Sequence, residues 1–470
     1  MTNLKTLVGI EHRSPSRHLR FHGWLIPVIG LILLPISPLK AAPVDLLFGR
    51  KSADTIDFSA TERCGEAFTA WPLIVRVTCP SSWDPAQSGE WSLVELNADR
   101  APLYRLPLQK LQVIDALSAS DKPAPVQAID ICFPITIKPE ETRTYRLLRT
   151  GADTNLPWTH NRPADLLIEG QGPGARVDTG NTVFGFHPAN GQFGWYMPKN
   201  ASITNRLGFV QGVEAACHHN PDVWCYPRSW GHTSDWRCQA TNELAPEQII
   251  QKGPLVYRYI RKGWMPNCDG IQTWVSYTVF AGLPLLIESS SMEFTKSSTV
   301  SAVRNNELVF NRGIHTHAAY PDTKGKPISV QAFDPAHPTK FFGRLPIPDL
   351  DPDIPWVALY NDTKKYGVAM LNLERWSFTG APGHPANMPG YYYFNDYGEH
   401  GTGAHFDWNF LYLCRAEIYT GTVLPAGSQF SENSAILVLQ EGSARPDHLR
   451  EIEPWRKRLE YPPVIKFMGK

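Results

Sequence analysis

The chain has 470 residues, of which 42% are hydrophobic and 19% are charged, a balance typical of a globular protein rather than a disordered one. Lys and Arg together number 45, as do Asp and Glu, so the formal net charge is zero. Proteins that bind nucleic acid carry a clear basic excess, so this balance argues against a nucleic-acid partner.

The first 42 residues have the order of an export signal. Basic residues precede an uncharged apolar run from Trp24 to Leu39, and small residues follow at Ala41 and Ala42. The run is about 16 residues long, shorter than the roughly 20 that a spanning helix needs. We therefore predict residues 1–42 to be an export signal cleaved near Ala41 or Ala42, with an uncleaved anchor as the alternative. The protein is then secreted, periplasmic or held at the cell surface, with no membrane contact apart from the signal.

Export makes the eight cysteines candidates for disulfides first, because an oxidising compartment favours paired thiols. Cys64 and Cys79 flank one strand-like segment and are candidates for pairing with each other. A second group is expected to bridge a long loop: Cys217, Cys225, Cys238 and Cys268. Connectivity does not follow from the sequence, but we expect at least two disulfides.

Residues 43–165 are predicted to form an N-terminal β-sandwich. Short runs with alternating apolar residues occur at Trp71–Cys79, Trp91–Leu96 and Thr144–Leu148, separated by Pro, Gly, Ser and Asp. Lys138–Thr142 has the composition of a turn between two such strands.

Residues 166–470 are predicted to form a second, larger β domain that carries the site. The part from 166 to about 270 is rich in Gly, Asn and Pro and has few long apolar runs, and Cys217–Cys238 within it is predicted to be a long loop. Strand patterns then follow at 255–260, 272–280, 285–294, 356–360, 366–371 and 435–439. Asn361–Lys365 fits a hairpin connection, and Pro446–Leu459 is the best helix candidate. The predicted fold is all-β, an N-terminal sandwich followed by a large antiparallel β-supersandwich with long disulfide-bearing loops.

Several of these runs resemble a known family. The succession Gly253–Tyr259, Val275–Glu288 and a strand ending at Phe294 is similar to the supersandwich of the galactose-mutarotase-like superfamily. Trp356–Tyr360 with the strand after it fits the same pattern, and Phe133–Ile137 resembles sandwich domains that precede such modules. The superfamily supplies sandwich domains to many polysaccharide lyases and glycosidases. The resemblance covers about residues 70–150 and 250–440 and implies a carbohydrate-handling protein whose sandwich holds the site.

The first candidate site lies within residues 311–320. If this segment is a strand, His315 and His317 point to one face and Arg312 to the other, because side chains alternate. Two imidazoles on one face suit a metal site, or one can act as base with Tyr320 as acid. A pair of hydrogen-bonded polar residues on an exposed face explains the pattern equally well.

The second candidate site is the segment 391–408. Its glycines make a helix or regular strand improbable, so we predict a loop. It contains residues suited to proton transfer, namely Tyr393, Glu399, His400 and His405, and residues suited to holding a sugar, namely Tyr391, Asp407 and Trp408. We expect this loop to meet residues 311–320 at one concave face, and we expect His400→Ala or His405→Ala to lower turnover by at least about 10²-fold.

A third group lies near the clustered cysteines. His218, His219, Asp222 and His232 include metal-ligand types, so a Ca or Zn ion is compatible with the loop, although a purely disulfide-bound loop explains it better. Trp230 is a candidate sugar-stacking residue and Arg206 a candidate carboxylate partner. No metal ligand is assigned, and no cofactor is required by any motif.

Together these residues predict a carbohydrate-active enzyme acting on a polysaccharide, most simply a lyase. β-Elimination at a uronic acid needs a cation to neutralise the carboxylate, a base and an acid. The candidates in that order are Arg312 or Arg206; a histidine among His315, His317, His400 and His405; and Tyr320 or Tyr393. A glycoside hydrolase using Glu399 and Asp407 is the nearest alternative. A non-catalytic carbohydrate-binding surface protein and a sugar epimerase also stay open.

Overall fold

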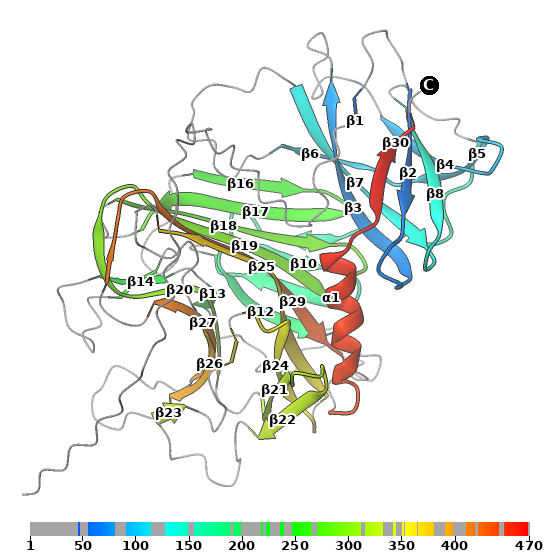
Figure 1. Cartoon of the computed structure of the whole chain (residues 1–470). Coiled ribbons are helices and arrows are strands. Elements are labelled where there is room, and N and C mark those ends of the chain that lie inside the picture. The colour runs from blue at the N-terminus through cyan, green and yellow to red at the C-terminus, as the bar shows by residue number, and fades with distance from the viewer. Residues whose placement is uncertain are drawn as a thin grey trace, which may run out of the picture. The chain divides into compact units, whose positions relative to one another are not determined.

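The computed structural model describes residues 46–47, 55–79, 91–113, 127–148, 155–188, 191–198, 218–219, 222–225, 236–238, 247–265, 270–311, 315–331, 342–344, 350–351, 353–363, 365–379, 391–397, 410–418, 422–440 and 446–468. In this part of the chain strands β1 to β30 are accompanied by a single α-helix, α1 (Ile452–Glu460), preceded by the 3-10 turn η1 (Leu449–Glu451). The prediction of an all-β fold is confirmed, and α1 lies inside the predicted helical segment (Figure 1).

Two sheets form the front sandwich. The first has the strand order β1 (Leu46–Leu47), β3 (Phe68–Cys79), β7 (Gln127–Ile137) and β6 (Gln109–Gln112). The second has the order β30 (Val464–Phe467), β2 (Thr55–Thr61), β8 (Thr142–Leu148), β4 (Ser92–Leu96) and β5 (Pro102–Leu106). The rings of Phe58 and Phe133 meet between the sheets at 5.8 Å. The predicted turn between β7 and β8 is confirmed, and Glu140 adopts a left-handed φ of 61° in it.

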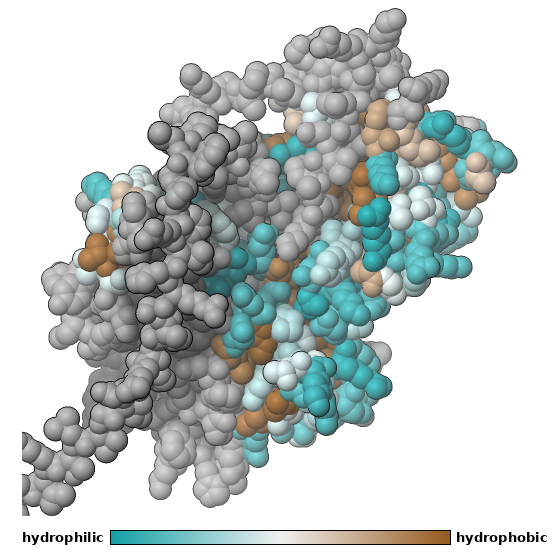
Figure 2. Space-filling model, in the orientation of Figure 1, coloured by the Kyte–Doolittle hydropathy of each residue, from teal (hydrophilic) through white to brown (hydrophobic). Residues whose placement is uncertain are grey.

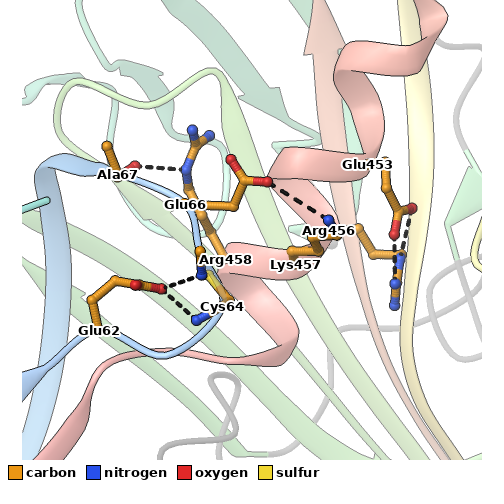
Figure 3. A network of polar contacts seen from close by, with 9 residues as sticks. Glu62, Cys64, Glu66, Ala67, Glu453, Arg456, Lys457 and Arg458 are labelled. Atoms are coloured by element: carbon orange, nitrogen blue, oxygen red, sulfur yellow. Dashed lines mark hydrogen bonds and ion pairs between the residues drawn. The ribbon is translucent and has the colours of Figure 1, made fainter. Parts of the chain in front are cut away.

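The end of the chain returns to this front sandwich. Strand β30 pairs with β2, so the last strand completes a sheet that otherwise comes from residues before 150. Figure 3 shows how α1 meets the loop before β3: Arg458 donates to the carbonyl of Ala67 at 2.9 Å, and Lys457 lies 3.8 Å from Glu66. The rings of Trp71 and Trp455 lie 5.8 Å apart beside these contacts. Apolar packing and polar contacts therefore hold the C-terminal helix against the front sandwich.

A nine-stranded sheet, here the central sheet, organises the rest. Its order is β16 (Glu247–Lys252), β17 (Val256–Trp264), β18 (Ile271–Phe280), β19 (Leu285–Phe294), β29 (Ser428–Leu439), β25 (Tyr366–Phe378), β24 (Trp356–Asn361), β21 (His317–Pro321) and β22 (Pro327–Gln331). All the strand patterns predicted after residue 253 belong to it. The predicted hairpin connection between β24 and β25 is confirmed, with Lys365 donating to the carbonyl of Asn361 at 2.8 Å.

Two smaller sheets accompany it. The cover sheet has the order β12 (Phe193–Pro198), β11 (Thr182–Phe186), β10 (Arg176–Asp178) and β9 (Leu167–Glu169). The eight-stranded sheet has the order β15 (Trp236–Cys238), β14 (Asp222–Cys225), β20 (Ser298–Asn311), β27 (Phe410–Ile418), β26 (Tyr391–Tyr397) and β23 (Phe342–Arg344), with β13 (His218–His219) and β28 (Thr422–Leu424) also paired to β20.

Two sequence-based expectations are corrected here. Cys217–Cys238, predicted to be one long loop, contains the short strands β13, β14 and β15, and residues 166–198, for which no strand was predicted, form the cover sheet. Short strands leave little periodicity to detect. Tyr391–Tyr397, predicted to be a loop, is strand β26. Its run of aromatic residues has high β-propensity, and the glycines used as the argument begin only at Gly398.

The central sheet is buried on both faces, and the sequences of its strands therefore contain continuous apolar runs. In β29, Ala435, Leu437 and Leu439 join a front cluster with the front sandwich and α1, whereas Ile436 and Val438 join a cover cluster with the cover sheet. Side chains alternate between the faces of a strand, so a continuous apolar run marks a strand covered on both sides. Nearer the start of β29, Phe430 packs with Met292 of β19 and Val303 of β20 in a third cluster, here the end cluster.

Cys64 carries a free thiol, so the bridge to Cys79 considered from the sequence is not formed. The reason is geometric. Cys79 ends β3, whose 12 residues extend for roughly 36 Å at about 3.3 Å per residue, whereas disulfide-linked Cα atoms lie within about 7 Å. Cys132 is also a free thiol, fully buried in the front cluster. The side chains of the remaining cysteines lie outside the described residues.

The predicted export signal lies outside the described residues. Within the described part of the chain, no helix has both the length and the apolar character needed to cross a membrane. On the face seen in Figure 2, hydrophilic residues cover most of the described surface, and hydrophobic residues form small separate patches.

Candidate functional site

A band of buried polar side chains crosses the central sheet between the cover cluster and the end cluster. In β19, Glu288 and Ser290 follow Leu286 and precede Met292 on one face, because side chains of the same parity share a face. Glu288 is fully buried and Ser290 likewise. The face that elsewhere holds apolar clusters therefore becomes charged in the middle of the sheet.

The neighbouring strand repeats the pattern in register. Ser434 of β29 lies opposite Glu288, and Glu432 lies opposite Ser290. Glu432 is 1% exposed, and its Oε1 accepts a hydrogen bond of 3.0 Å from the hydroxyl of Ser434. Two buried carboxyl groups thus occupy diagonal positions on adjacent strands, where Cα atoms are about 7–8 Å apart and Cβ atoms somewhat closer.

Arginines flank the two carboxyl groups on the same face. Arg261 of β17 is 2% exposed and lies opposite Val275 of β18. Val275 in turn lies opposite Ser290 of β19, so Arg261 belongs to the same cross-strand row as Ser290 and Glu432. On the other side, Arg375 of β25 lies directly opposite Glu432. Removing a carboxylate from water is costly unless cations and hydrogen bonds compensate, and two guanidinium groups match two carboxylates in this band.

A β-bulge in β25 determines that Arg375 takes part. The register with β29 shifts between Asn372 and Glu374, so that Leu373 faces no partner residue. Without this extra residue, Glu374 rather than Arg375 would share a face with Asn372, and a third carboxylate would join the band. With it, Glu374 turns to the opposite face and Arg375 takes the position opposite Glu432, where its Nε also lies 3.3 Å from Oδ1 of Asp353. We name the set Glu288, Glu432, Arg261, Arg375, Ser290 and Ser434 the carboxylate band.

His315 is placed apart from the carboxylate band, as part of a buried structural pair. It is fully buried; its Nε2 lies 2.8 Å from the hydroxyl of Tyr196 in the cover sheet, and its ring meets Tyr366 edge-on at 5.9 Å. Burial lowers the pKa of His315 to about 3, so the ring is neutral at ordinary pH. A neutral imidazole enclosed between two tyrosines is not poised for the proton transfer predicted for it.

His317 contacts different residues from His315. Its ring stacks on Tyr360 at 5.1 Å, and its Nδ1 lies 2.9 Å from the hydroxyl of Thr316. Tyr360 belongs to the front cluster, whereas the Tyr366 partner of His315 belongs to the cover cluster. The prediction that both imidazoles share one face is therefore wrong. Strand β21 begins only at His317, so strict alternation does not extend back to position 315.

Tyr320 does not accompany His317 either. It is three residues further along β21, which places it on the other face, where it packs against the cover cluster. Tyr391 and Tyr393 lie in β26 of the eight-stranded sheet, with side chains outside the described residues. The remaining predicted site residues also lie outside them: Arg206, Trp230, Arg312, Glu399, His400, His405, Asp407 and Trp408. The meeting of residues 391–408 and 311–320 at one concave face therefore stays a prediction.

Glu288 and Glu432 were not among the predicted site residues, although a signal was present. Each lies two positions from a serine, and each has an apolar core residue of the same parity nearby: Leu286 beside Glu288, and Phe430 beside Glu432. A glutamate at a core position of a strand buried on both faces is rare unless it has a role. Within the described residues, no three His, Cys, Asp or Glu side chains are grouped closely enough to hold a metal ion.

Comparisons with known proteins give fold-level similarities only. No protein-family model and no curated protein sequence matches the chain. Among solved structures, it is similar to an α-mannosidase from Enterococcus faecalis V583, with 9% identity and a TM-score of 0.48, covering 90% of this chain and 46% of that one. A glycosyl hydrolase family 38 protein from Enterococcus faecalis gives 8% identity and 0.48, covering 89% of this chain and 48% of that one. The chain thus spans about half the length of these two proteins.

The YeaD protein from Salmonella typhimurium, which is provisionally described as a mutarotase, is also similar, with 12% identity and a TM-score of 0.35. This match covers 59% of the present chain and 94% of the YeaD chain. At TM-scores below 0.5, none of these similarities assigns an activity or a site to the chain.

Proposed function

We propose that this protein is a carbohydrate-active enzyme and that the carboxylate band is its reaction site, with glycoside hydrolysis as the reaction. The observation that carries the proposal is the diagonal pair Glu288 and Glu432 on adjacent central strands. Glycoside hydrolases use two carboxyl groups about 5–5.5 Å or about 6.5–9.5 Å apart. The Cα atoms of a diagonal cross-strand pair are about 7–8 Å apart, which allows side chains on the same face to bring their carboxyl groups into this span. One group protonates the glycosidic oxygen while the other activates water or attacks the sugar.

The surrounding residues support different roles for the two carboxyl groups. Glu432 accepts a hydrogen bond from Ser434 and lies opposite Arg375 in the register of the sheet. Glu288 lies between Tyr277 and Ser434 in its row, with no arginine directly opposite. On this difference in surroundings we assign Glu432 as the base or nucleophile and Glu288 as the general acid.

The residues described here favour hydrolysis over the elimination predicted from the sequence. Elimination requires a histidine or tyrosine base and acid around a uronic acid. Among the described candidates, His315 is neutral and enclosed, and His317 and Tyr320 lie on opposite faces of β21. A product absorbing near the ultraviolet edge would restore the lyase hypothesis.

Interconversion of the anomers of a free sugar is a second candidate. The observation that favours it is burial: Glu288 and Glu432 are at most 1% exposed, and a small sugar is enclosed more readily than a polymer. The reaction needs one acid and one base, which the same pair supplies. Polarimetry on freshly dissolved aldoses separates this activity from release of reducing ends.

The test replaces each carboxyl group by an amide of the same shape. We expect Glu288→Gln and Glu432→Gln each to lower turnover by about 10²–10⁴-fold, because each removes an acid or base from the reaction. Glu247→Gln, on the exposed edge strand β16, is the matched control and should keep wild-type activity. Thermal unfolding of all three variants monitors the fold. Full activity in both band variants, or no hydrolysis and no anomer conversion by the wild type on a broad panel of sugars, contradicts the proposal.

A further inference from the structure

The opposite face of the central sheet carries a second feature, which the proposed reaction does not use. Beyond the front cluster, strands β25, β29, β19, β18 and β17 present two cross-strand rows. The first runs Trp376, Ser431, Ser291, Trp274, and the second runs Phe378, Gln429, Glu293, Gln272, Trp264. Aromatic residues thus stand at both ends of the second row. In the first row, Trp376 and Trp274 enclose two serines, and Lys262 of β17 follows Trp274.

Alternation along the strands separates these rows from the carboxylate band. Ser377, Phe430 and Met292 lie between the row residues in sequence and point to the other face, where Phe430 and Met292 form the end cluster. Glu432 likewise alternates with Ser431. The two faces of the same sheet therefore hold two independent polar regions. We name Trp376, Phe378, Ser431, Ser291, Gln272 and Trp264 the aromatic–serine strip.

The strip is open at its aromatic ends. Phe378 is 45% exposed and Trp264 is 55% exposed, whereas most large apolar residues of the sheet are buried. The rings of Trp376 and Phe378 are nearly parallel, at 9° with centroids 6.1 Å apart. From β25 to β17 there are four strand steps of about 4.8 Å, so the aromatic ends are separated by roughly 19 Å. This length suits several linked sugar rings rather than one.

Unsatisfied polar atoms border the strip. In the adjoining row, Asn433 lies opposite Ser289, and the two residues are 4% and 0% exposed. Neither the Asn433 Oδ1 nor the Ser289 hydroxyl has a hydrogen-bond partner within the described part of the chain. These two buried polar groups make the sheet polar, not apolar, directly beside the strip.

The charge of the region identifies the class of ligand. Glu293 and Glu374 lie on this face with Lys262, so the local charge is slightly negative. Anionic polymers such as uronates or sulfated glycans would meet like charge here. Aromatic rings, serine hydroxyls and carboxamides instead suit a neutral sugar, whose C–H faces pack on rings while its hydroxyls bond polar groups.

We propose that the aromatic–serine strip is a non-catalytic binding surface for a neutral polysaccharide. Sugar rings stack on Trp264 at one end and on Phe378 with Trp376 at the other. Between these ends the polymer lies along Gln429, Glu293 and Gln272, which are partly exposed, whereas Ser431 and Ser291 are each only 5% exposed. This surface would hold a polymer on the face opposite the carboxylate band. The proposal does not depend on the reaction assigned to Glu288 and Glu432.

The test measures polymer binding by native affinity electrophoresis, with soluble glucomannan, mixed-linkage β-glucan and xylan as neutral probes and polygalacturonate as the anionic probe. We expect the wild type to be retarded by at least one neutral polymer. Trp264→Ala and Phe378→Ala should each weaken that binding by roughly 2- to 12-fold, the loss of one aromatic contact of about 0.5–1.5 kcal/mol. Glu288→Gln should bind normally, which separates this surface from the reaction site.

Trp158→Ala is the matched control. Trp158 is 43% exposed on the loop after the front sandwich, with the guanidinium groups of Arg105 and Arg162 over its ring at 4.5 and 5.1 Å. Its loss should leave retardation unchanged. No retardation of the wild type by any neutral polymer, equal weakening by Trp158→Ala, or preference for polygalacturonate overturns the proposal. So does a light-scattering mass showing that Trp264→Ala dissociates an oligomer, since the strip would then be a protein interface.

Discussion

One side chain, Gln109, joins the front sandwich to the central sheet, and its removal is a sharp test of how the two are held together. Gln109 lies in β6 and is 8% exposed. Its Oε1 accepts hydrogen bonds from the backbone N–H groups of Leu255 and Val256, at 2.9 and 2.8 Å. Its Nε2 donates to the carbonyl of Val256 at 3.0 Å. The amide thus replaces a strand neighbour where β16 has turned away at Gly253.

The expected cost of Gln109→Leu follows from these bonds. The substitution keeps the approximate size of the side chain but leaves two backbone N–H groups and one carbonyl without that partner. An unsatisfied buried group costs about 1–3 kcal/mol, and the added apolar contact of leucine offsets part of the total, so we expect a loss of about 2–4 kcal/mol. Gly253→Ala tests the same contact from the other side, because a Cβ at this position would lie 2.2 Å from Cδ of Gln109.

Hydrogen exchange gives the local readout and urea unfolding the global one. In Gln109→Leu, the amides of Leu255 and Val256 should exchange faster, and the urea midpoint should fall. Gln112→Leu is the matched control, because Gln112 is an exposed residue of the same strand. Its backbone pairs with Ile129, and its carbonyl accepts a hydrogen bond from the Gln251 amide; both contacts are independent of its side chain. If Gln109→Leu matches this control in both measurements, the Gln109 amide does not join the front sandwich to the central sheet as we infer.

Two further predictions concern acid stability and processing. Burial alone raises the pKa of Asp57, but hydrogen bonds from Arg146 and Arg100 outweigh it and hold the pKa below its ordinary value. The ionised form is therefore stabilising above the unfolded-state pKa, and this stabilisation should disappear as pH falls below about 4, so that unfolding midpoints of Asp57→Asn vary less with acid than those of the wild type. A wild-type curve as flat as the variant's would show that the ion pairs contribute nothing. Intact-mass and non-reducing peptide analysis of protein from its native host should find a chain beginning after Ala41 or Ala42 and at least two disulfides; a mass that includes Met1 would oppose the export signal, and fully reduced cysteines would oppose the oxidising compartment.

Local patterning accounts for what the sequence predicted well. The alternation in Trp71–Cys79 and the apolar run in Ala435–Leu439 identified strands because strand periodicity depends only on neighbouring residues. The turns at Lys138–Thr142 and Asn361–Lys365 were recognisable for the same reason. All-β character thus followed from short-range order, without knowledge of which strands pair.

The candidate site depended on long-range pairing that no local pattern contains. Glu288 and Glu432 are far apart in the chain and become neighbours only because β19 pairs with β29 in one register. A slip of one residue would move one of them to the other face. The bulge at Leu373, which brings Arg375 opposite Glu432, is likewise a property of the pairing.

The two histidines of residues 311–320 show that a local pattern can also predict a wrong arrangement. The spacing of His315 and His317 predicted a shared face, but the strand begins at His317, and the cover sheet encloses His315 against Tyr196. By itself, the sequence determined the all-β class and most strands of the central sheet, because side-chain alternation is local. Tertiary structure alone decided which charged residues meet, because strand register and the packing of one sheet on another determine which side chains share a face and which are buried together.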